Sequence, residues 1–234
     1  MYMVQKLKLF HGSPQIIEMP ELAKGKPYND YGRGFYCTQS LELAKEWACS
    51  TETDGFANCY DFDQKGLSIL DLSCGEYSIL NWLSILLENR TFHIGGEVAQ
   101  RGKDYLLAHF NVDYKNYNVI KGYRADDSYF SFAAAFLNNT ISIAKLERAM
   151  MLGSLGEQIV LRSQKAFDNI AFIESFAAAK SIYLPKKMAR DTAARAEFQQ
   201  KKANVNAENE FYLIDIIRGR WQNDDPRLQR ILLK

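Results

Sequence analysis

The sequence predicts an α+β fold with a helical tail. Short apolar runs with the spacing of β-strands recur between residues 7 and 176. Segments with apolar residues at helical spacing lie between these runs. From residue 186 to residue 220 the pattern is helical only, rich in Ala, Arg, Lys, Glu and Gln. We therefore expect one domain over residues 1–180 and a helical extension over residues 181–234 that packs on it.

Composition and charge are those of a globular protein. The 234 residues are 47% hydrophobic and 13% aromatic, with charges of both signs mixed throughout, which is unlike a disordered chain. The net charge of +1 argues against binding to polyanions through overall charge. A local basic patch would still be able to hold a nucleic acid.

Cysteine usage and hydropathy favour a cytoplasmic protein. The four cysteines form no CxxC pair and only three histidines are present, which argues against a zinc site and against a disulfide framework. The first residues lack the apolar run of a signal peptide, and the most apolar window, residues 79–87, is too short to span a bilayer. We expect no metal and no membrane partner, while delivery to another cell stays open.

Two strands are expected near the N-terminus, each with a polar or aromatic residue beside glycine. The first, residues 7–13, ends in His11-Gly12-Ser13, and the second, residues 32–38, reads Gly-Arg-Gly-Phe-Tyr-Cys-Thr. Because glycine lets the main chain approach a flat, polar ligand closely, these strand ends suit a binding site. Alternatively, the histidine is an ordinary strand-end residue and the tyrosine is a core aromatic with a satisfied hydroxyl.

The loop and the elements that follow are assigned in chain order. Residues 14–30 contain Pro, Gly and Asn-Asp, which form turns. Ser40 is the expected N-cap of a helix that runs to about residue 51. Residues 56–62 and 67–72 are the next two expected strands, and the turn-forming residues between them predict a hairpin.

The middle of the chain alternates between helices and strands. By the same criteria we expect helices over residues 77–87, 96–110 and 143–152, and strands over residues 117–122 and 171–176. A further helix is expected to begin with Asp126 as its N-cap. Arg124, Asp127 and Tyr129 form a polar cluster there, which either caps a solvated helix start or belongs to a site.

Another strand is expected to follow the break at residues 153–156, and it opens with an acid and an amide. Glu157 and Gln158 precede the apolar run Ile-Val-Leu. Because neighbouring residues of a strand point to opposite faces, only one of the two side chains can face a ligand.

Together, these motifs resemble the NAD-binding core of the ADP-ribosyltransferase superfamily. The resemblance is to the branch whose triad reads His, Tyr and Glu or Gln. Its order and spacing are matched by the His-Gly-Ser strand end, the Gly-Arg-Gly-Phe-Tyr-Cys-Thr run and the helix after it. The chain looks most like a bacterial family known only as a domain of unknown function within that superfamily. The resemblance covers residues 6 to about 180 and implies a split, mainly antiparallel β-sheet with flanking helices.

The resemblance also implies that NAD is the co-substrate and that no metal is needed. Tyr36 would provide a platform for the positively charged nicotinamide ring. The Gly12 backbone would bind the carboxamide of that ring. His11 would bind the adenosine ribose, with help from Ser13.

Two further groups of NAD need partners. Arg33, beside the bare backbone of Gly34, would reach the diphosphate. Read against family members with Asn-Glu-Tyr-Ile-Val, Glu157 takes the third catalytic place; in the other register Gln158 does. We favour Glu157, because a carboxylate stabilises the positive charge that develops as nicotinamide leaves. A glutamine would orient the ribose hydroxyls without supplying that charge.

The implied activity is mono-ADP-ribosyl transfer from NAD to a protein or a nucleic acid. Similar bacterial domains serve as toxins, some in toxin–antitoxin pairs with a cognate antitoxin as partner, or in defence against phage. One alternative is an NAD glycohydrolase, with water as the acceptor, and another is a non-catalytic binding module on the same fold. Tyr28, Tyr31 and residues 24–26 offer a modest surface for a nucleic-acid acceptor.

Overall fold

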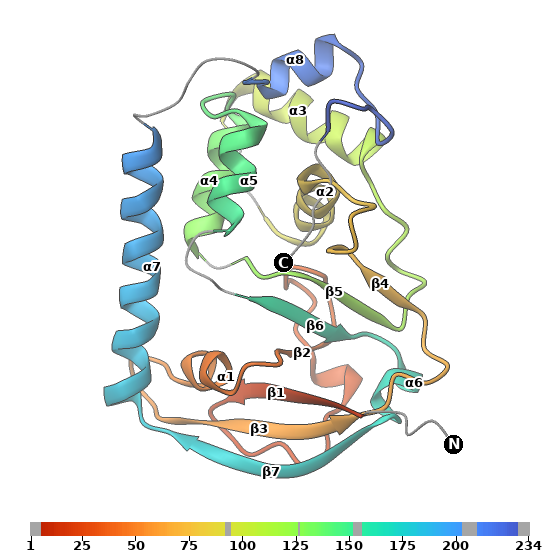
Figure 1. The fold of residues 1–234 in the computed structure, drawn as a ribbon. Helices are drawn as coiled ribbons and strands as arrows, with labels where there is room; N and C mark the ends of the chain where they lie inside the picture. Colours follow the sequence, from red (N-terminus) through yellow and green to blue (C-terminus); the bar gives the residue numbers. More distant parts are fainter. Residues whose placement is uncertain (1–5, 92–94, 126, 152–155, 203–209, 229–234) are drawn as a thin grey trace.

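The computed structural model describes residues 6–91, 95–125, 127–151, 156–202 and 210–228. Two β-sheets lie one above the other at one end of the molecule, and most of the helices gather at the other end (Figure 1). In the described part of the chain, no helix is both long enough and apolar enough to span a membrane.

The first sheet has three antiparallel strands in the order β1-β3-β7, which are β1 (Leu7–Ser13), β3 (Gly55–Phe62) and β7 (Ile170–Ala178). The second has the order β2-β6-β5-β4, from β2 (Phe35–Cys37), β4 (Ile69–Asp71), β5 (Val119–Tyr123) and β6 (Glu157–Leu161). Of its pairs in the described residues, only β4 and β5 run parallel. The predicted α+β fold with a mainly antiparallel, split sheet is confirmed.

The predicted hairpin between residues 56–62 and 67–72 is wrong. β3 lies in the centre of the first sheet, paired with β1 on one side and β7 on the other, so no edge is left for the next strand. β4 instead pairs with the free edge of β5, about fifty residues further along the chain. The choice of partner is set by these distant strands and not by the local turn.

The apolar core between the sheets fixes the orientation of β6. Leu9 and Tyr60 of the first sheet pack with Phe35, Ile159 and Leu161 of the second. Because side chains alternate along a strand, Glu157 lies on the same face of β6 as Ile159 and Leu161. Gln158 and Val160, which alternate with them, point to the opposite face. This alternation decides which side chain at the start of β6 reaches the site described below.

The helices beyond the second sheet cover its other face. α2 (Ile79–Asn89) is buried over its first nine residues because nearly all of them are apolar. It contacts α3 (Gly96–His109) and α5 (Ile143–Met151). α4 (Asp127–Leu137) packs on both of these helices, and α8 (Leu213–Arg218) packs on α3. The predicted cap Asp126 lies outside the described residues. Two short helical turns also lie in the described part of the chain, η1 (Leu22–Lys24) and α6 (Gln164–Phe167).

One helix packs on the first sheet, and another follows the last strand of that sheet. In α1 (Leu41–Ala48) the Ser40 hydroxyl accepts a hydrogen bond from Leu43 N at 3.3 Å, as the predicted cap requires, although the helix ends three residues before the expected boundary. α7 (Lys180–Lys202) runs along one edge of the molecule and contacts α1, α4 and α5 (Figure 1).

The helical tail differs from the prediction in its boundaries. We expected one helical run over residues 186–220, but α7 already begins at Lys180 and a separate α8 follows. The backbone N–H of Lys180 donates to the Asp54 carboxylate at 2.8 Å, a cap from a segment 126 residues away. A local pattern would place Pro185 in the first turn of the helix, because proline is favoured there. The distant cap explains why the helix instead begins before Pro185.

Candidate functional site

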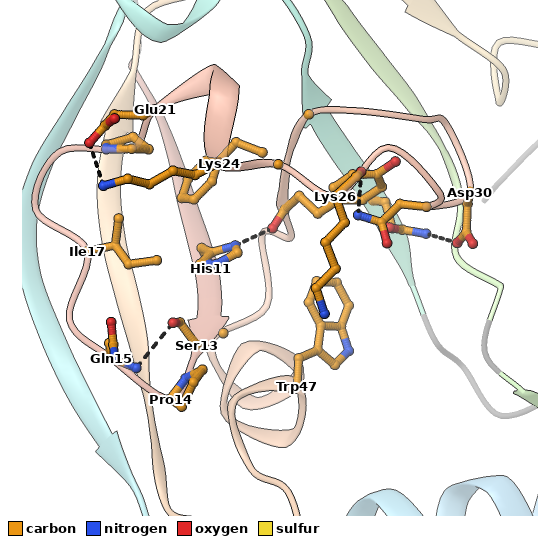
Figure 2. Close-up of a pocket in the computed structure, with 18 of the residues that line it drawn as sticks. His11, Ser13, Pro14, Gln15, Ile17, Glu21, Lys24, Lys26, Asp30 and Trp47 are labelled. Atoms are coloured by element: carbon orange, nitrogen blue, oxygen red, sulfur yellow. Dashed lines mark hydrogen bonds and ion pairs between the residues drawn. The ribbon is translucent and has the colours of Figure 1, made fainter. Parts of the chain in front are cut away.

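A cavity of about 840 Å³ opens beside the ends of β1, β2 and β6, within the size range of small-molecule sites. The loop over residues 14–30 forms much of its wall (Figure 2). α1 contributes Trp47 and α7 contributes Lys187. The strands contribute His11, Gly12, Ser13, Phe35, Tyr36 and Gln158, and Gly34 directly precedes β2. Segments that are far apart in the sequence thus meet around one space.

The cavity wall includes the point where β1 and β2 separate. Phe10 and Thr38 exchange two backbone hydrogen bonds, at 2.8 and 2.9 Å, but the next pair of residues does not continue the ladder. The His11 Nδ1 atom instead lies 2.7 Å from the Tyr36 carbonyl oxygen. In a β-strand, the N–H and C=O groups of residues two apart face the same edge. Because those of Phe10 face Thr38, the N–H and C=O of Gly12 face this gap. Gly12 thus offers one donor and one acceptor there.

Gly12 also has a packing role. A Cβ at this position would overlap the Ala44 carbonyl oxygen and would lie 2.7 Å from Ala48 N, so the residue must be glycine for α1 to pack on β1. The packing of α1 therefore explains this glycine without any ligand.

His11 is held in one tautomer. Its Nδ1 must carry the proton, because the Tyr36 carbonyl can only accept. The ring stacks on Phe35, with centroids 4.2 Å apart. Burial lowers the pKa of His11, although the bond to Tyr36 opposes this effect, so the ring is neutral near pH 7. The remaining nitrogen, Nε2, is consequently an acceptor.

Tyr36 is also held firmly. Its hydroxyl donates to the Gly32 carbonyl at 2.6 Å and accepts from Tyr31 N at 3.0 Å. The turn that makes this possible has φ +76° at Gly32, a conformation that favours glycine. Burial raises the pKa of Tyr36 far above its usual range. The phenol therefore cannot act as an acid or a base near neutral pH, and what it can offer a ligand is its ring.

Gln158, and not Glu157, lines the cavity. The Gln158 Nε2 atom donates to Asp30 Oδ2 at 2.9 Å and to the Tyr123 carbonyl at 3.3 Å, which uses both of its N–H groups. The Oε1 atom has no protein partner among the described residues. The side chain therefore presents a hydrogen-bond acceptor to a ligand.

Glu157 faces away from this cavity. Its carboxylate accepts from the Ser73 hydroxyl at 2.9 Å and lies 3.0 Å from the Lys121 ammonium group. Asp71 completes this cluster, since its carboxylate lies 3.4 Å from the same ammonium group. Our preference for Glu157 relied on its charge, whereas the register of β6 places the neighbouring residue in the cavity.

The other predicted site residues divide into three groups. Ser13 and Gly34 line the cavity, and Arg124 does too, with its guanidinium group 4.2 Å from the Trp47 ring centroid. Arg33 is not part of the wall, because its guanidinium group donates to the Ala23 carbonyl at 2.7 Å on the exposed side of the loop. The side chains of Asp127 and Tyr129 lie outside the described part of the chain.

Several cavity residues were not predicted. The wall also contains Asp30, Arg90, Trp47 and Lys187. In the sequence, the first of these reads as a turn residue, the second as a helix end and the other two as helix positions. In total the wall holds five cationic side chains and three carboxylates, which leaves an excess of positive charge. They are Lys24, Lys26, Arg90, Arg124 and Lys187, with Glu18, Glu21 and Asp30.

Asn58 is a further residue that the sequence analysis missed. It is fully buried in β3, donates to the carbonyls of His11 and Gln15, and accepts from Ile17 N at 3.1 Å. These bonds hold the start of the loop above the cavity. An amide in the middle of a mostly apolar strand was the signal that could have identified it.

Comparison with known proteins places the chain in a family. Residues 7–172 match a family described as "Protein of unknown function (DUF3990)". A search of curated proteins and a search of solved structures found no match. The matched region runs from β1 into β7 and contains every residue of the cavity except Lys187. Because the match spans more than half of the 234 residues, the chain belongs to the DUF3990 family.

Proposed function

We propose that this protein is a mono-ADP-ribosyltransferase that uses NAD and transfers ADP-ribose to a protein or a nucleic acid. The observation that carries the proposal is the convergence of three side chains. His11, Tyr36 and Gln158 come from three strands, in the order of the superfamily triad, and line one cavity together with Gly12. The volume of about 840 Å³ is suitable for a dinucleotide.

The nicotinamide, a ribose and the diphosphate of NAD each have a matching partner in the cavity. The Tyr36 ring would support the nicotinamide, while the Gly12 N–H and C=O would bind its carboxamide. The acceptor His11 Nε2 suits a ribose hydroxyl. Among the cationic side chains of the wall, Arg90 and Arg124 replace Arg33 as partners for the diphosphate.

Catalysis in this proposal depends mainly on orientation. The Gln158 Oε1 atom would accept a hydrogen bond from a hydroxyl of the nicotinamide-side ribose and hold that sugar while the bond to nicotinamide breaks. The transition state resembles an oxocarbenium ion, so a fixed, electron-rich oxygen near the sugar favours it. The acceptor then attacks the anomeric carbon.

The test is transfer of label from NAD to macromolecules. Purified protein is incubated with NAD labelled in its adenylate phosphate and with bacterial cell extract, and the products are treated with protease or with nuclease. The wild type is expected to label a macromolecule, and His11→Ala and Gln158→Ala are expected to label much less. Glu157→Gln is the matched control, because this residue is the neighbour of Gln158 on the opposite face of β6.

Each result discriminates between functions. Release of free ADP-ribose without labelled macromolecules would identify an NAD glycohydrolase. No consumption of NAD would leave a binding module and refute the proposal. Equal labelling by wild type and by the His11 and Gln158 variants would place the chemistry elsewhere on the protein.

A further inference from the structure

One carboxylate lies in the cavity wall directly behind Gln158. Asp30 has a relative exposure of 6%, so it is removed from water although it belongs to a surface loop. Its Oδ2 atom accepts two hydrogen bonds, from Gln158 Nε2 at 2.9 Å and from Ala125 N at 3.0 Å. Its Oδ1 atom lies 3.9 Å from Arg90 Nε. The bond to Gln158 joins the carboxylate to the side chain that faces the ligand.

The orientation of the Gln158 amide follows from its partners. Asp30 accepts, and the Tyr123 carbonyl can only accept, so both positions require the nitrogen end of the amide. Rotating the amide by 180° would bring its oxygen against two other oxygens. The partners therefore hold Oε1 as the free end of the side chain.

We propose that Asp30 is a positioning residue for the reaction proposed above and supplies the negative charge of the site through Gln158. Burial raises the pKa of Asp30, whereas the hydrogen bonds from Gln158 and Ala125 N and the charges of Arg90 and Arg124 lower it. In its ionised form, Asp30 strengthens the hydrogen bond from the amide and increases the electron density on Oε1. Because Asp30 is buried, a negative charge on it, separated from the reacting sugar only by the Gln158 amide, also favours a developing positive charge. This inference rests on the proposed function.

Asp30 also explains why the third residue of the triad is an amide. A glutamate at position 158 would place a second carboxylate against Asp30 and the Tyr123 carbonyl. The acid that we expected at the start of β6 is thus provided by the loop before β2.

Asp30→Asn separates this role from a purely structural one. The introduced amide oxygen can accept from both Gln158 and Ala125, so the hydrogen bonds of Oδ2 are kept while the charge is removed. Asp71→Asn is the matched control, because that carboxylate bonds Ser73 and Lys121 outside the cavity. Asp30→Ala removes the charge and the hydrogen bonds together.

The experiment measures kcat and KM for NAD consumption, with thermal unfolding of each variant. For Asp30→Asn we expect kcat to fall about tenfold with KM and melting temperature nearly unchanged. Asp30→Ala is expected to lose about 100-fold in kcat, because the amide is no longer held. Asp71→Asn should keep the kcat of the wild type.

Two results would overturn the inference while leaving the proposed function intact. One is a wild-type kcat for Asp30→Asn alongside an inactive Gln158→Ala. The other is a fall in activity of Asp30→Asn that is matched by a lower melting temperature and a higher KM, which would indicate a structural role. If the wild type does not consume NAD, the proposed function fails, and the inference fails with it.

Discussion

The substitution Gln158→Glu tests the geometry of the site most sharply, because it changes one group and adds no volume. In the triad that the sequence resembles, Glu and Gln both occupy the third place, so the resemblance alone predicts a tolerated or improved variant. The structure predicts a damaged one. The Nε2 atom that donates at 2.9 and 3.3 Å is replaced by an oxygen that faces two acceptors.

The magnitude follows from the two lost bonds. A hydrogen bond to a charged partner contributes about 1.5–3 kcal/mol and one to a neutral partner about 0.5–1.5 kcal/mol. We therefore expect the free energy of unfolding to fall by about 2–4 kcal/mol at pH 7.5. That is a large part of the total stability of an ordinary domain, about 5–15 kcal/mol.

The loss depends on pH. Asp30 raises the pKa of the introduced carboxyl in the folded state above its value of about 4.3 in the unfolded chain. The folded variant then binds more protons than the unfolded one, so its stability decreases as pH rises through the folded-state pKa. The difference from wild type should therefore be larger at pH 7.5 than at pH 5. In its protonated form the new side chain can donate to Asp30.

Urea unfolding followed by circular dichroism measures both quantities. Glu157→Gln serves as the control and should show no comparable loss, because its side chain lies on the other face of β6. A Gln158→Glu variant as stable as the wild type at both pH values would refute the contacts assigned to this side chain. Higher NAD turnover by that variant would refute the role assigned to Asp30.

Three further predictions concern packing and charge around the site. Gly12→Ala should lower the free energy of unfolding by about 3 kcal/mol or more, because the new methyl group overlaps α1. A variant that is as stable as the wild type in urea unfolding would contradict this packing. The pKa of His11 lies below its ordinary value of 6.5 in the folded state, so the wild type should lose stability relative to His11→Gln as pH falls from 7.5 to 5. The same change in stability with pH for both proteins would argue against a buried neutral ring. Burial raises the pKa of Glu147 from 4.5 to about 7. Glu147→Gln should therefore be more stable than the wild type by about 1–3 kcal/mol at pH 8 but not at pH 4. An equal effect of the substitution at both pH values would be inconsistent with this shift.

Local patterns were sufficient to predict most elements of the fold. The alternation in β1, the apolar run of β6 and the Ser40 cap depend on residues close together in the chain, and the structure has them where we expected. The position of β4 was mispredicted, because its partner β5 is distant in the sequence. A turn can indicate that the chain changes direction, but it does not determine which strand edge is free.

The same limit applies to the site. Sequence identified His11, Tyr36 and the pair at the start of β6, but charge favoured Glu157, and only the register of the sheet shows that Gln158 faces the cavity. Asp30 resembles an ordinary turn residue after Asn29. Its partners lie 95 and 128 residues away, so no local pattern could reveal its burial.

Release of nicotinamide from NAD by purified protein, in the presence of cell extract, tests the central claim most directly. We predict release by wild type and by Glu157→Gln, and a rate lower by at least about 100-fold for Gln158→Ala. The account is contradicted if the wild type releases none, or if Glu157→Gln loses the activity that Gln158→Ala retains.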